Sequence, residues 1–264
     1  MKFKNVLLAS DFDGTLANSN GKISDDVVSA IKYFMSEGGK FTVCTGRSYQ
    51  GFHLYSEKYI NAPVLLCNGA MAYDYGNERI TFNDAIDEEG FDPINEVLTK
   101  LPGISVETYN FNSVCGINIC DDNVRHFTSQ GIEFLSVNRP EDAPLPWTKV
   151  MIYAEGCSQE VQKILDKHSE INYLKTTGDY VEILKKDVDK GSGLLKLGNM
   201  LGCDSKDIYA AGDGYNDIEM LVAAKAGFVP QNGSKEALNV ADYVTRSNDK
   251  GCIANIIEIL DVIY

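Results

Sequence analysis

An apolar run at residues 6–10 leads directly into two aspartates, Asp11 and Asp13, and then into Gly14 and Thr15. The run VLLAS has the near-continuous hydrophobicity of a strand that is buried on both faces of a parallel sheet. Gly14 permits a sharp turn just where the carboxylates emerge. Because ligands of open α/β sheets bind beyond the carboxyl ends of the strands, this stretch predicts a buried strand that carries two carboxylates into a site.

The segments around this stretch alternate between strand and helix patterns. Before residue 83, apolar residues at helical spacing predict helices at 25–37 and 48–59. Short apolar runs in the same part of the chain predict strands at 41–44 and 63–67. The same alternation returns after residue 186, with helices at 191–201, 217–224 and 251–262 and strands at 208–211, 227–229 and 243–245. This order is typical of a doubly wound parallel α/β sheet.

Residues 83–186 lack that alternation. Their patterns predict helices at 88–101 and 159–169, strands at 113–119 and 149–154, and a loop with three prolines at 138–147. We therefore expect an inserted α+β domain at 83–186, within a sheet domain formed by 1–82 and 187–264. Hinges are expected near residues 81–83 and 185–187.

The composition limits the partners and the compartment. A formal net charge of −14 disfavours binding to nucleic acids or anionic membranes, which need basic surfaces. Seven cysteines without a Cys-x-x-Cys pair indicate reduced thiols, and none of the three histidines has zinc-ligand spacing to a cysteine. The first apolar run is too short for a signal peptide, and no run has the length of a membrane span. We expect a soluble cytoplasmic protein, monomeric or weakly dimeric.

Polar residues recur where the predicted strands of the core end. The set is Asp11, Asp13, Thr45, Lys190, Asp213, Asn216 and Asp217. Several carboxylates at one edge need a compensating cation, and oxygen ligands without His or Cys favour Mg²⁺. One Mg²⁺ and the Lys190 ammonium would offset three carboxylates, so the site could accept a phosphate despite the acidic chain.

This set suits phosphoryl transfer through an aspartyl-phosphate. Asp11 would be the nucleophile, Asp13 the general acid and then base, and Thr45 and Lys190 the donors to the phosphate oxygens. Taken alone, residues 11–14 could form a calcium loop or a helix-capping turn. Residues 212–217 alone could be an Asx-rich turn that caps a helix.

Four motifs together carry a family resemblance: DFDGT at 11–15, TGR at 45–47, KG at 190–191 and GDGYND at 212–217, with NGA at 68–70 beside them. With these motifs in this order, the chain resembles the haloacid dehalogenase superfamily of phosphatases over essentially its whole length. The resemblance is to the Cof-like sugar-phosphatase branch, which has a type IIB cap.

The resemblance implies roles residue by residue. Asp11 looks like the nucleophile and Asp13 like the acid/base. Mg²⁺ in such proteins is held by the Asp11 carboxylate, the Asp13 main-chain carbonyl and the Asp213 side chain, with Asp217 in the outer shell. The residues similar to the family's phosphate-binding set are Thr45, Gly46, Lys190 and Asn216. The chain departs from the branch at 230–233, where PQNG replaces a sequence close to MGNA and retains Asn232.

Some assignments stay open. Arg47 would either contact substrate or brace the cap through an ion pair, and Asn68 is a candidate to line the site. The expected substrates are small phosphorylated metabolites, with sugar phosphates first and flavin mononucleotide or pyridoxal phosphate as further candidates. A phosphomutase and a non-catalytic regulatory module that binds a phosphometabolite are the alternatives.

Overall fold

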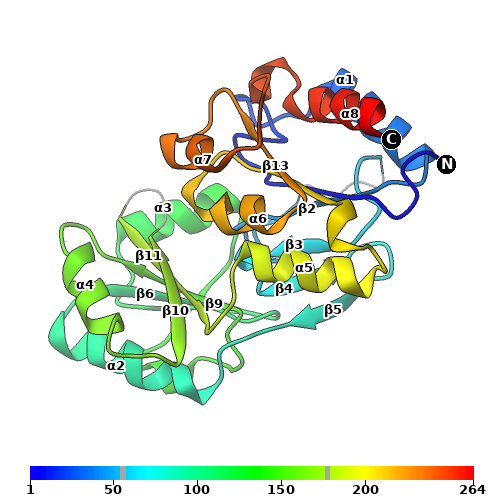
Figure 1. Ribbon diagram of the computed structural model, residues 1–264. Helices are drawn as coiled ribbons and strands as arrows, with labels where there is room; N and C mark the ends of the chain where they lie inside the picture. The colour runs from blue at the N-terminus through cyan, green and yellow to red at the C-terminus, as the bar shows by residue number, and fades with distance from the viewer. Residues whose placement is uncertain (54–57, 176–178) are drawn as a thin grey trace. The chain divides into compact units, whose positions relative to one another are not determined.

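The structure is a computed structural model that describes residues 1–53, 58–175 and 179–264. These residues form two compact units (Figure 1). The first contains Met1–Gly46, residues 58–82 and Asp189–Tyr264, and the second contains Arg47–His53 and the described part of Asn83–Val188. Arg47–His53 thus belongs to the same unit as the described part of 83–188, and the division into a catalytic core and a cap stays a prediction.

The first unit is built on a five-stranded parallel sheet with the order β14-β13-β12-β1-β2. The strands are β1 (Leu7–Ser10), β2 (Lys40–Val43), β12 (Ile208–Ala211), β13 (Ala226–Pro230) and β14 (Tyr243–Thr245). From β1 the chain proceeds outward to β2, whereas from β12 it proceeds in the opposite direction to β13. The carboxyl ends of β1 and β12 therefore lie at the topological switch point, where such sheets bind ligands.

A smaller sheet adjoins this one. A parallel bridge between Cys44 and Leu65 places β3 (Val64–Leu66) beside β2. The chain then passes through the 3₁₀ turn η1 (Cys67–Gly69) into β4 (Met71–Asp74), which pairs antiparallel with β3, and into β5 (Arg79–Asn83). The strand predicted at 63–67 is thus present as the shorter β3, and it also starts a second sheet.

Helices cover both faces of the parallel sheet. They are α1 (Asp25–Ser36), α5 (Lys190–Met200), α6 (Ile218–Ala223), α7 (Lys235–Val240) and α8 (Cys252–Ile263). Helices α5, α6 and α7 bury apolar side chains such as Leu194 and Met220 against Leu7 and Ala210 of the sheet. Helices α1 and α8 pack together on the opposite face (Figure 1). The predicted doubly wound fold is confirmed.

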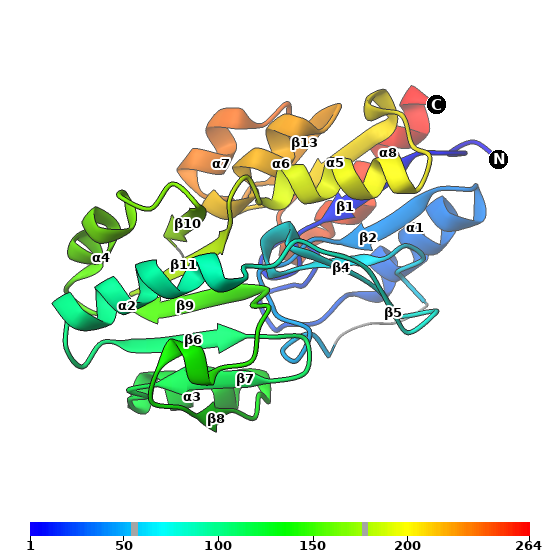
Figure 2. The same cartoon turned by 90° about the horizontal axis from the view of Figure 1, so that it is seen from below.

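The second unit is α+β, as predicted. Its six-stranded sheet has the order β10-β11-β9-β6-β7-β8 and is antiparallel except for the last pair. The strands are β6 (Ser105–Tyr109), β7 (Val114–Ile117), β8 (Leu135–Ser136), β9 (Lys149–Tyr153), β10 (Ile171–Lys175) and β11 (Tyr180–Lys185). Helices α2 (Phe91–Lys100) and α4 (Ser158–Leu165) pack on one face, and α3 (Asp121–Gln130) packs on the other (Figure 2).

The helix predicted at 48–59 is wrong for the described residues 48–53 and 58–59, which form turns, and residues 54–57 lie outside the described residues. Side chains of this segment bind the second unit instead. Gln50 donates from Nε2 to the carbonyls of Asn110 (2.7 Å) and Phe111 (2.9 Å). The ring of Tyr49 packs on that of Phe111 at 4.5 Å between centroids. These tertiary contacts outweigh the local helical pattern.

A charged cluster joins α2 to the turn after α4. The ring of His168 lies between two carboxylates, with Nε2 2.9 Å from Glu96 Oε2 and Nδ1 2.8 Å from Glu170 Oε1. Burial disfavours the imidazolium, but the hydrogen bonds to the two carboxylates outweigh it and raise the pKa of His168 above 6.5. The pairing of the His168 imidazolium with the two carboxylates therefore stabilises the folded protein fully at pH values below about 6.5, the pKa of histidine in the unfolded chain. This stabilisation is lost as the pH rises through the higher pKa of His168 in the folded protein.

The substitution His168→Gln tests this sign. We expect it to lower the melting temperature by about 2 °C at pH 6, where the imidazolium pairs with both carboxylates, and by less at pH 8.5. Thermal unfolding at the two pH values measures the difference. An equal loss at both would contradict a charged His168.

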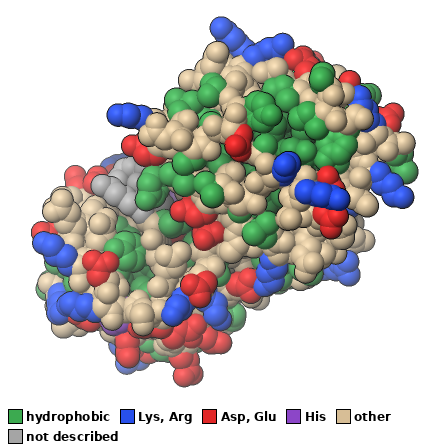
Figure 3. Space-filling view, viewed as in Figure 1, with side chains coloured by type: hydrophobic (Ala, Val, Ile, Leu, Met, Phe, Trp, Pro, Cys, Tyr) green, Lys and Arg blue, Asp and Glu red, His purple; other side chains and the backbone are tan. Residues whose placement is uncertain are grey.

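Charged side chains of both signs are present on one face of the molecule. On the face in Figure 3, Lys and Arg side chains lie interspersed among Asp and Glu. No helix in the described part of the chain combines the length and apolarity needed to cross a bilayer.

Candidate active site

The site starts at the end of β1. Asp11 follows the strand directly, and its N–H donates to the carbonyl of Ala211 at the end of β12 (2.8 Å). Asp11 is buried, whereas the side chain of Asp13 is exposed. The turn that follows Asp13 needs a glycine at position 14. The φ of Gly14 is +85°, and a Cβ added there would lie 2.5 Å from Asp213 Oδ2. Only glycine lets the backbone approach that carboxylate so closely.

Lys190 is the buried cation of the site. It is the first residue of α5 and is fully inaccessible, and its Nζ lies 2.7 Å from Asp11 Oδ1 and 2.6 Å from Asp217 Oδ1. Lys190 thus forms an ion-paired triad with Asp11, 179 positions before it in the sequence, and Asp217, 27 positions after it. A buried ammonium is stable only when it is paired and hydrogen-bonded, and the two carboxylates meet both conditions.

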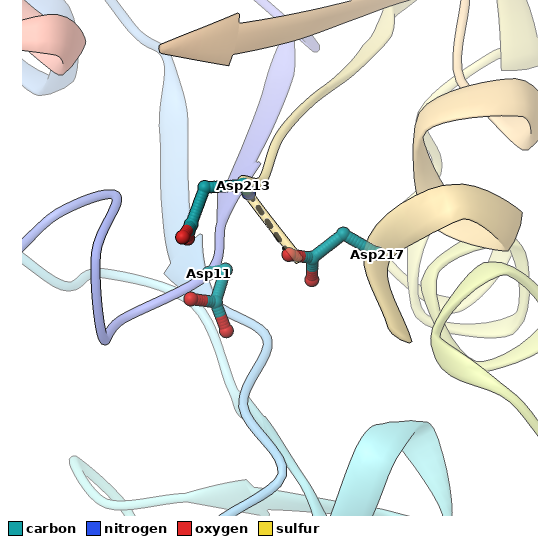
Figure 4. Close-up of side chains that lie close together, drawn as sticks. All are labelled: Asp11, Asp213 and Asp217. Atoms are coloured by element: carbon teal, nitrogen blue, oxygen red, sulfur yellow. Dashed lines mark hydrogen bonds between the residues drawn. The ribbon is translucent and has the colours of Figure 1, made fainter. Parts of the chain in front are cut away.

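Both carboxylate oxygens of Asp217 already accept hydrogen bonds within the protein. One oxygen accepts from Lys190, and the other accepts from the backbone N–H groups of Asp213 (3.0 Å) and Gly214 (2.8 Å). Figure 4 shows the bond to the Asp213 backbone. Both oxygens of Asp217 therefore already hold the lysine and the loop, which suits an outer position better than direct metal ligation.

Asp213 faces Asp11 across the switch point (Figure 4). Its Oδ1 accepts a hydrogen bond from Thr15 Oγ1 at 2.7 Å. Ligand atoms of Asp11, Asp213 and Asp217 all lie within 4.8 Å of one another. The carboxylates of Asp11 and Asp213 supply oxygen ligands of the kind that a hard divalent cation such as Mg²⁺ requires, with Asp217 beside them in the outer shell, so these residues fit the ion implied by the family.

Burial disfavours the ionised form of the carboxylates in this cluster. Burial, more than any other cause, raises the pKa of Asp11 to about 8; Lys190 lowers it by less, and Asp217 raises it further. Burial likewise raises the pKa of Asp213. For Lys190, burial disfavours the charged form, yet the charges of Asp11 and Asp217 outweigh it and raise the pKa. A divalent cation among these oxygens would stabilise the ionised carboxylates.

The start of α5 is held by close backbone contacts. A Cβ on Gly193 would lie 2.6 Å from the carbonyl oxygen of Gly69, and a Cβ on Gly191 would lie 2.5 Å from that of Glu219. The helix is also capped, because Asp189 accepts the N–H of Ser192 at 2.7 Å. These contacts place Lys190 beneath Asp11. Sequence reasoning missed them, although the glycine-rich KGSG pattern was a usable signal.

We expect Gly193→Ala to destabilise the protein by about 1–3 kcal/mol, because the added methyl group meets backbone rather than a movable side chain. Urea-induced unfolding measures this change. The control is Ser192→Ala on the same turn, which removes the bond that the Ser192 hydroxyl accepts from the N–H of Asp189 (2.9 Å) and leaves the close contact of Gly193 unchanged. A Gly193→Ala variant as stable as the wild type would contradict the close contact.

The remaining predicted residues of the first unit gather around η1. The N–H of Asn68 donates to the carbonyl of Thr45 (3.0 Å), and Asn216 Nδ2 donates to Asn68 Oδ1 (2.9 Å). Thr45 and Asn68 are buried, and a Cβ on Gly46 would lie 3.2 Å from Asn68 Oδ1. Asn68 has φ of +50°, a strained value for a residue with a side chain, which is typical of functional loops. Thr45, Gly46, Asn68 and Asn216 therefore form one group.

Arg47 belongs to the second unit, where its guanidinium lies 3.4 Å from the carbonyl oxygen of Gly51. Whether it contacts substrate or braces the cap stays a prediction. Thr15, which orients Asp213, was absent from the predicted site, although it is the last residue of the DFDGT motif.

Comparisons with known proteins identify the family of the chain. The profile of the haloacid dehalogenase-like hydrolases matches residues 8–257. The chain is 26% identical to the 5-amino-6-(5-phospho-D-ribitylamino)uracil phosphatase YitU of Bacillus subtilis over 98% of both chains. It is also 26% identical to the phosphatase of the same name YwtE of that organism, over 95% of this chain and 96% of YwtE.

A solved structure shares the fold. The subclass IIB sugar phosphatase BT4131 superposes with a TM-score of 0.86 over 97% of this chain and 99% of its own, at 20% identity. A second neighbour, BT1666 from Bacteroides thetaiotaomicron, gives a TM-score of 0.86 at 21% identity, over 98% and 96% of the two chains. The profile match covers nearly the whole chain and includes every carboxylate of the site. The chain belongs to the haloacid dehalogenase-like hydrolase family, and its activity is that of a phosphatase.

Proposed function

We propose that this protein is a Mg²⁺-dependent phosphatase of small phosphorylated metabolites, with sugar phosphates as the first candidates. The observation that carries the proposal is the position of the Asp11 carboxylate, at a sheet switch point, paired with a buried lysine and close to two further carboxylates. We also propose that it acts in the cytoplasm, because all seven cysteines, each among the described residues, are free thiols.

The first half-reaction forms a phosphoenzyme. An Asp11 oxygen attacks the phosphorus as the ester P–O bond breaks, and Asp13 donates a proton to the leaving oxygen. The exposed side chain of Asp13 suits contact with a substrate that arrives from solvent. Lys190 holds the other side of Asp11 and offsets the negative charge that accumulates on the phosphoryl oxygens.

The second half-reaction returns the free enzyme. Asp13, now ionised, accepts a proton from water as the water oxygen attacks phosphorus; the bond to Asp11 breaks, and inorganic phosphate leaves. In this proposal Thr45, Gly46 and Asn216 bind the phosphate. Mg²⁺ would be held by the Asp11 and Asp213 carboxylates and the Asp13 carbonyl, and would reduce the repulsion between Asp11 and the phosphate dianion.

Phosphate release from a panel of metabolites tests the proposal. The panel contains sugar phosphates, flavin mononucleotide, pyridoxal phosphate and the uracil compound that appears in the names of YitU and YwtE. We expect release with Mg²⁺, loss after chelation by EDTA, and recovery when Mg²⁺ is added back. Conversion of a sugar phosphate into its isomer without phosphate release would instead identify a phosphomutase. Tight binding of a phosphometabolite without either product would identify a regulatory module.

A further inference from the structure

The loop between β13 and α7 contains the departure from the family pattern at 230–233. Asn232 of this loop uses both ends of its side chain on the backbone of other loops. Its Nδ2 donates to the carbonyl of Gly14 (2.9 Å), and its Oδ1 accepts the N–H of Asn248 (2.9 Å). The amide therefore connects the turn that follows Asp13 to the turn that precedes α8.

The same loop also binds the other side of the site. The N–H of Ser234 donates to the carbonyl of Asp213 at 2.8 Å. Two residues of one short loop thus hold the backbones of Gly14 and Asp213, which follow β1 and β12. Gly14 in turn lies against the Asp213 carboxylate, since a Cβ there would be 2.5 Å from Oδ2.

The chain that continues from this turn, at residues 17–19, is held by hydrogen bonds with Asn248 and Asp249. Asn248 Nδ2 donates to the carbonyl of Ala17 (3.0 Å), and Asp249 accepts from the N–H and hydroxyl of Ser19 (both 2.8 Å). These contacts hold residues 17–19 but do not reach Gly14. Among the hydrogen bonds of the described residues, the Asn232 amide is the side-chain donor to the Gly14 carbonyl.

We propose that Asn232 is a positioning residue, which sets the Asp13–Gly14 turn at the correct distance from Asp213 so that the acid/base and the metal-binding oxygens are aligned. The proposal rests on the proposed phosphatase mechanism. Asn232 does not touch the reacting atoms. It acts through the backbone of Gly14, next to the residue that moves the proton.

The exposure of Asn232 allows its effect on the active site to be distinguished from an effect on the stability of the fold. The residue is exposed, so water can replace its hydrogen bonds when the side chain is removed and the fold loses little. The rate of the reaction is more sensitive to loss of these hydrogen bonds than the stability of the fold is, because a displacement of about 1 Å in the site can lower a rate about 100-fold.

The chain offers a closely matched control in Asn61. This asparagine is also exposed and also bridges two backbone groups, since its Oδ1 accepts the N–H of Phe41 (2.8 Å) and its Nδ2 donates to the carbonyl of Gly39 (3.0 Å). These groups lie at the amino end of β2, at the opposite end from the site. Asn61→Ala therefore removes the same two kinds of bond without touching the catalytic edge.

The experiment compares Asn232→Ala with Asn61→Ala and the wild type. We expect Asn232→Ala to lower kcat by about 10–100-fold, with KM changed less than about twofold, and to weaken Mg²⁺ binding by a similar factor. Mg²⁺ binding is measured by calorimetric titration without substrate. Melting temperatures should be similar in both variants, and Asn61→Ala should retain kcat and Mg²⁺ affinity. Asn232→Asp, which keeps the acceptor but loses the donor, should lose at least as much activity as Asn232→Ala.

Two results would overturn the proposal: wild-type kcat and Mg²⁺ affinity in Asn232→Ala, or equal losses in Asn61→Ala. If Asn232→Ala does not fold, Asn232→Asp provides the same comparison. A wild-type protein that releases no phosphate would refute the proposed function, and the Mg²⁺ titration would still decide the role of Asn232.

Discussion

Asp11→Asn is expected to lower phosphate release by a factor on the order of 10⁴ or more while leaving the protein folded. The substitution replaces the carboxylate proposed as the nucleophile by an amide that cannot form the acyl phosphate, and removal of a covalent nucleophile has effects of this size or larger. The fold should persist because the side chain keeps its volume and one oxygen that can accept from Lys190, 2.7 Å away in the wild type.

The measurement is steady-state phosphate release on the best substrate, with circular dichroism as the test of folding. Asp13→Asn is the informative companion, because it keeps the nucleophile and removes the proton carrier. It should lower turnover by about 10²–10⁴-fold and allow some phosphoenzyme to form. Wild-type turnover in folded Asp11→Asn would refute the assignment of the nucleophile.

Lys190→Met should abolish activity and also destabilise the fold by about 3–5 kcal/mol. The variant leaves the carboxylates of Asp11 and Asp217 buried without the cation that both contact, and it removes the positive charge beside the transferred phosphoryl group. Breaking a buried ion pair by removing one partner is costly for this reason. Urea-induced unfolding in the presence of EDTA measures the loss without contribution from a metal.

Two variants make this prediction specific. Lys196→Met changes the same residue type on the same helix, but this lysine is exposed and its Nζ lies over the face of the Phe82 ring, 4.4 Å from the centroid, so we expect a loss of at most about 1 kcal/mol. The double variant Lys190→Met/Asp217→Asn should recover part of the lost stability, because it removes one of the unpaired charges, and should remain inactive. A Lys190→Met protein of wild-type stability would contradict the buried triad.

The fold was predictable where a local pattern and the tertiary structure agree. Strand β1 is buried throughout and reads as apolar, and α1 has one apolar face. The insert was harder. Strand β6 has the sequence SVETY, which includes the fully buried Glu107. That carboxylate accepts from Tyr109 (2.6 Å) and Asn123 (2.8 Å), so the partners that make its burial possible come from the tertiary structure.

The sequence by itself predicted which residues are the candidate reactive groups and the edge of the sheet at which they lie. Motifs near residues 11, 45, 190 and 213 lie at the ends of strands or at the start of a helix, and parallel strands bring such ends to one edge. The tertiary structure decided how these groups are arranged. It placed Lys190 between Asp11 and Asp217 through backbone contacts at Gly191 and Gly193.

The tertiary structure also decided the role of residues whose local sequence carries little signal. Residues 49–53 bind the second unit rather than forming a helix, and Asn232 holds the Gly14 carbonyl from a loop 218 positions away in sequence. The physical reason is the same in both cases. Hydrogen bonds between distant segments depend on distances that the packed sheets and helices set, whereas local patterns encode only the preferences of neighbouring residues. The DFDGT stretch therefore carries the residues proposed for the chemistry, and the packing around it sets their positions.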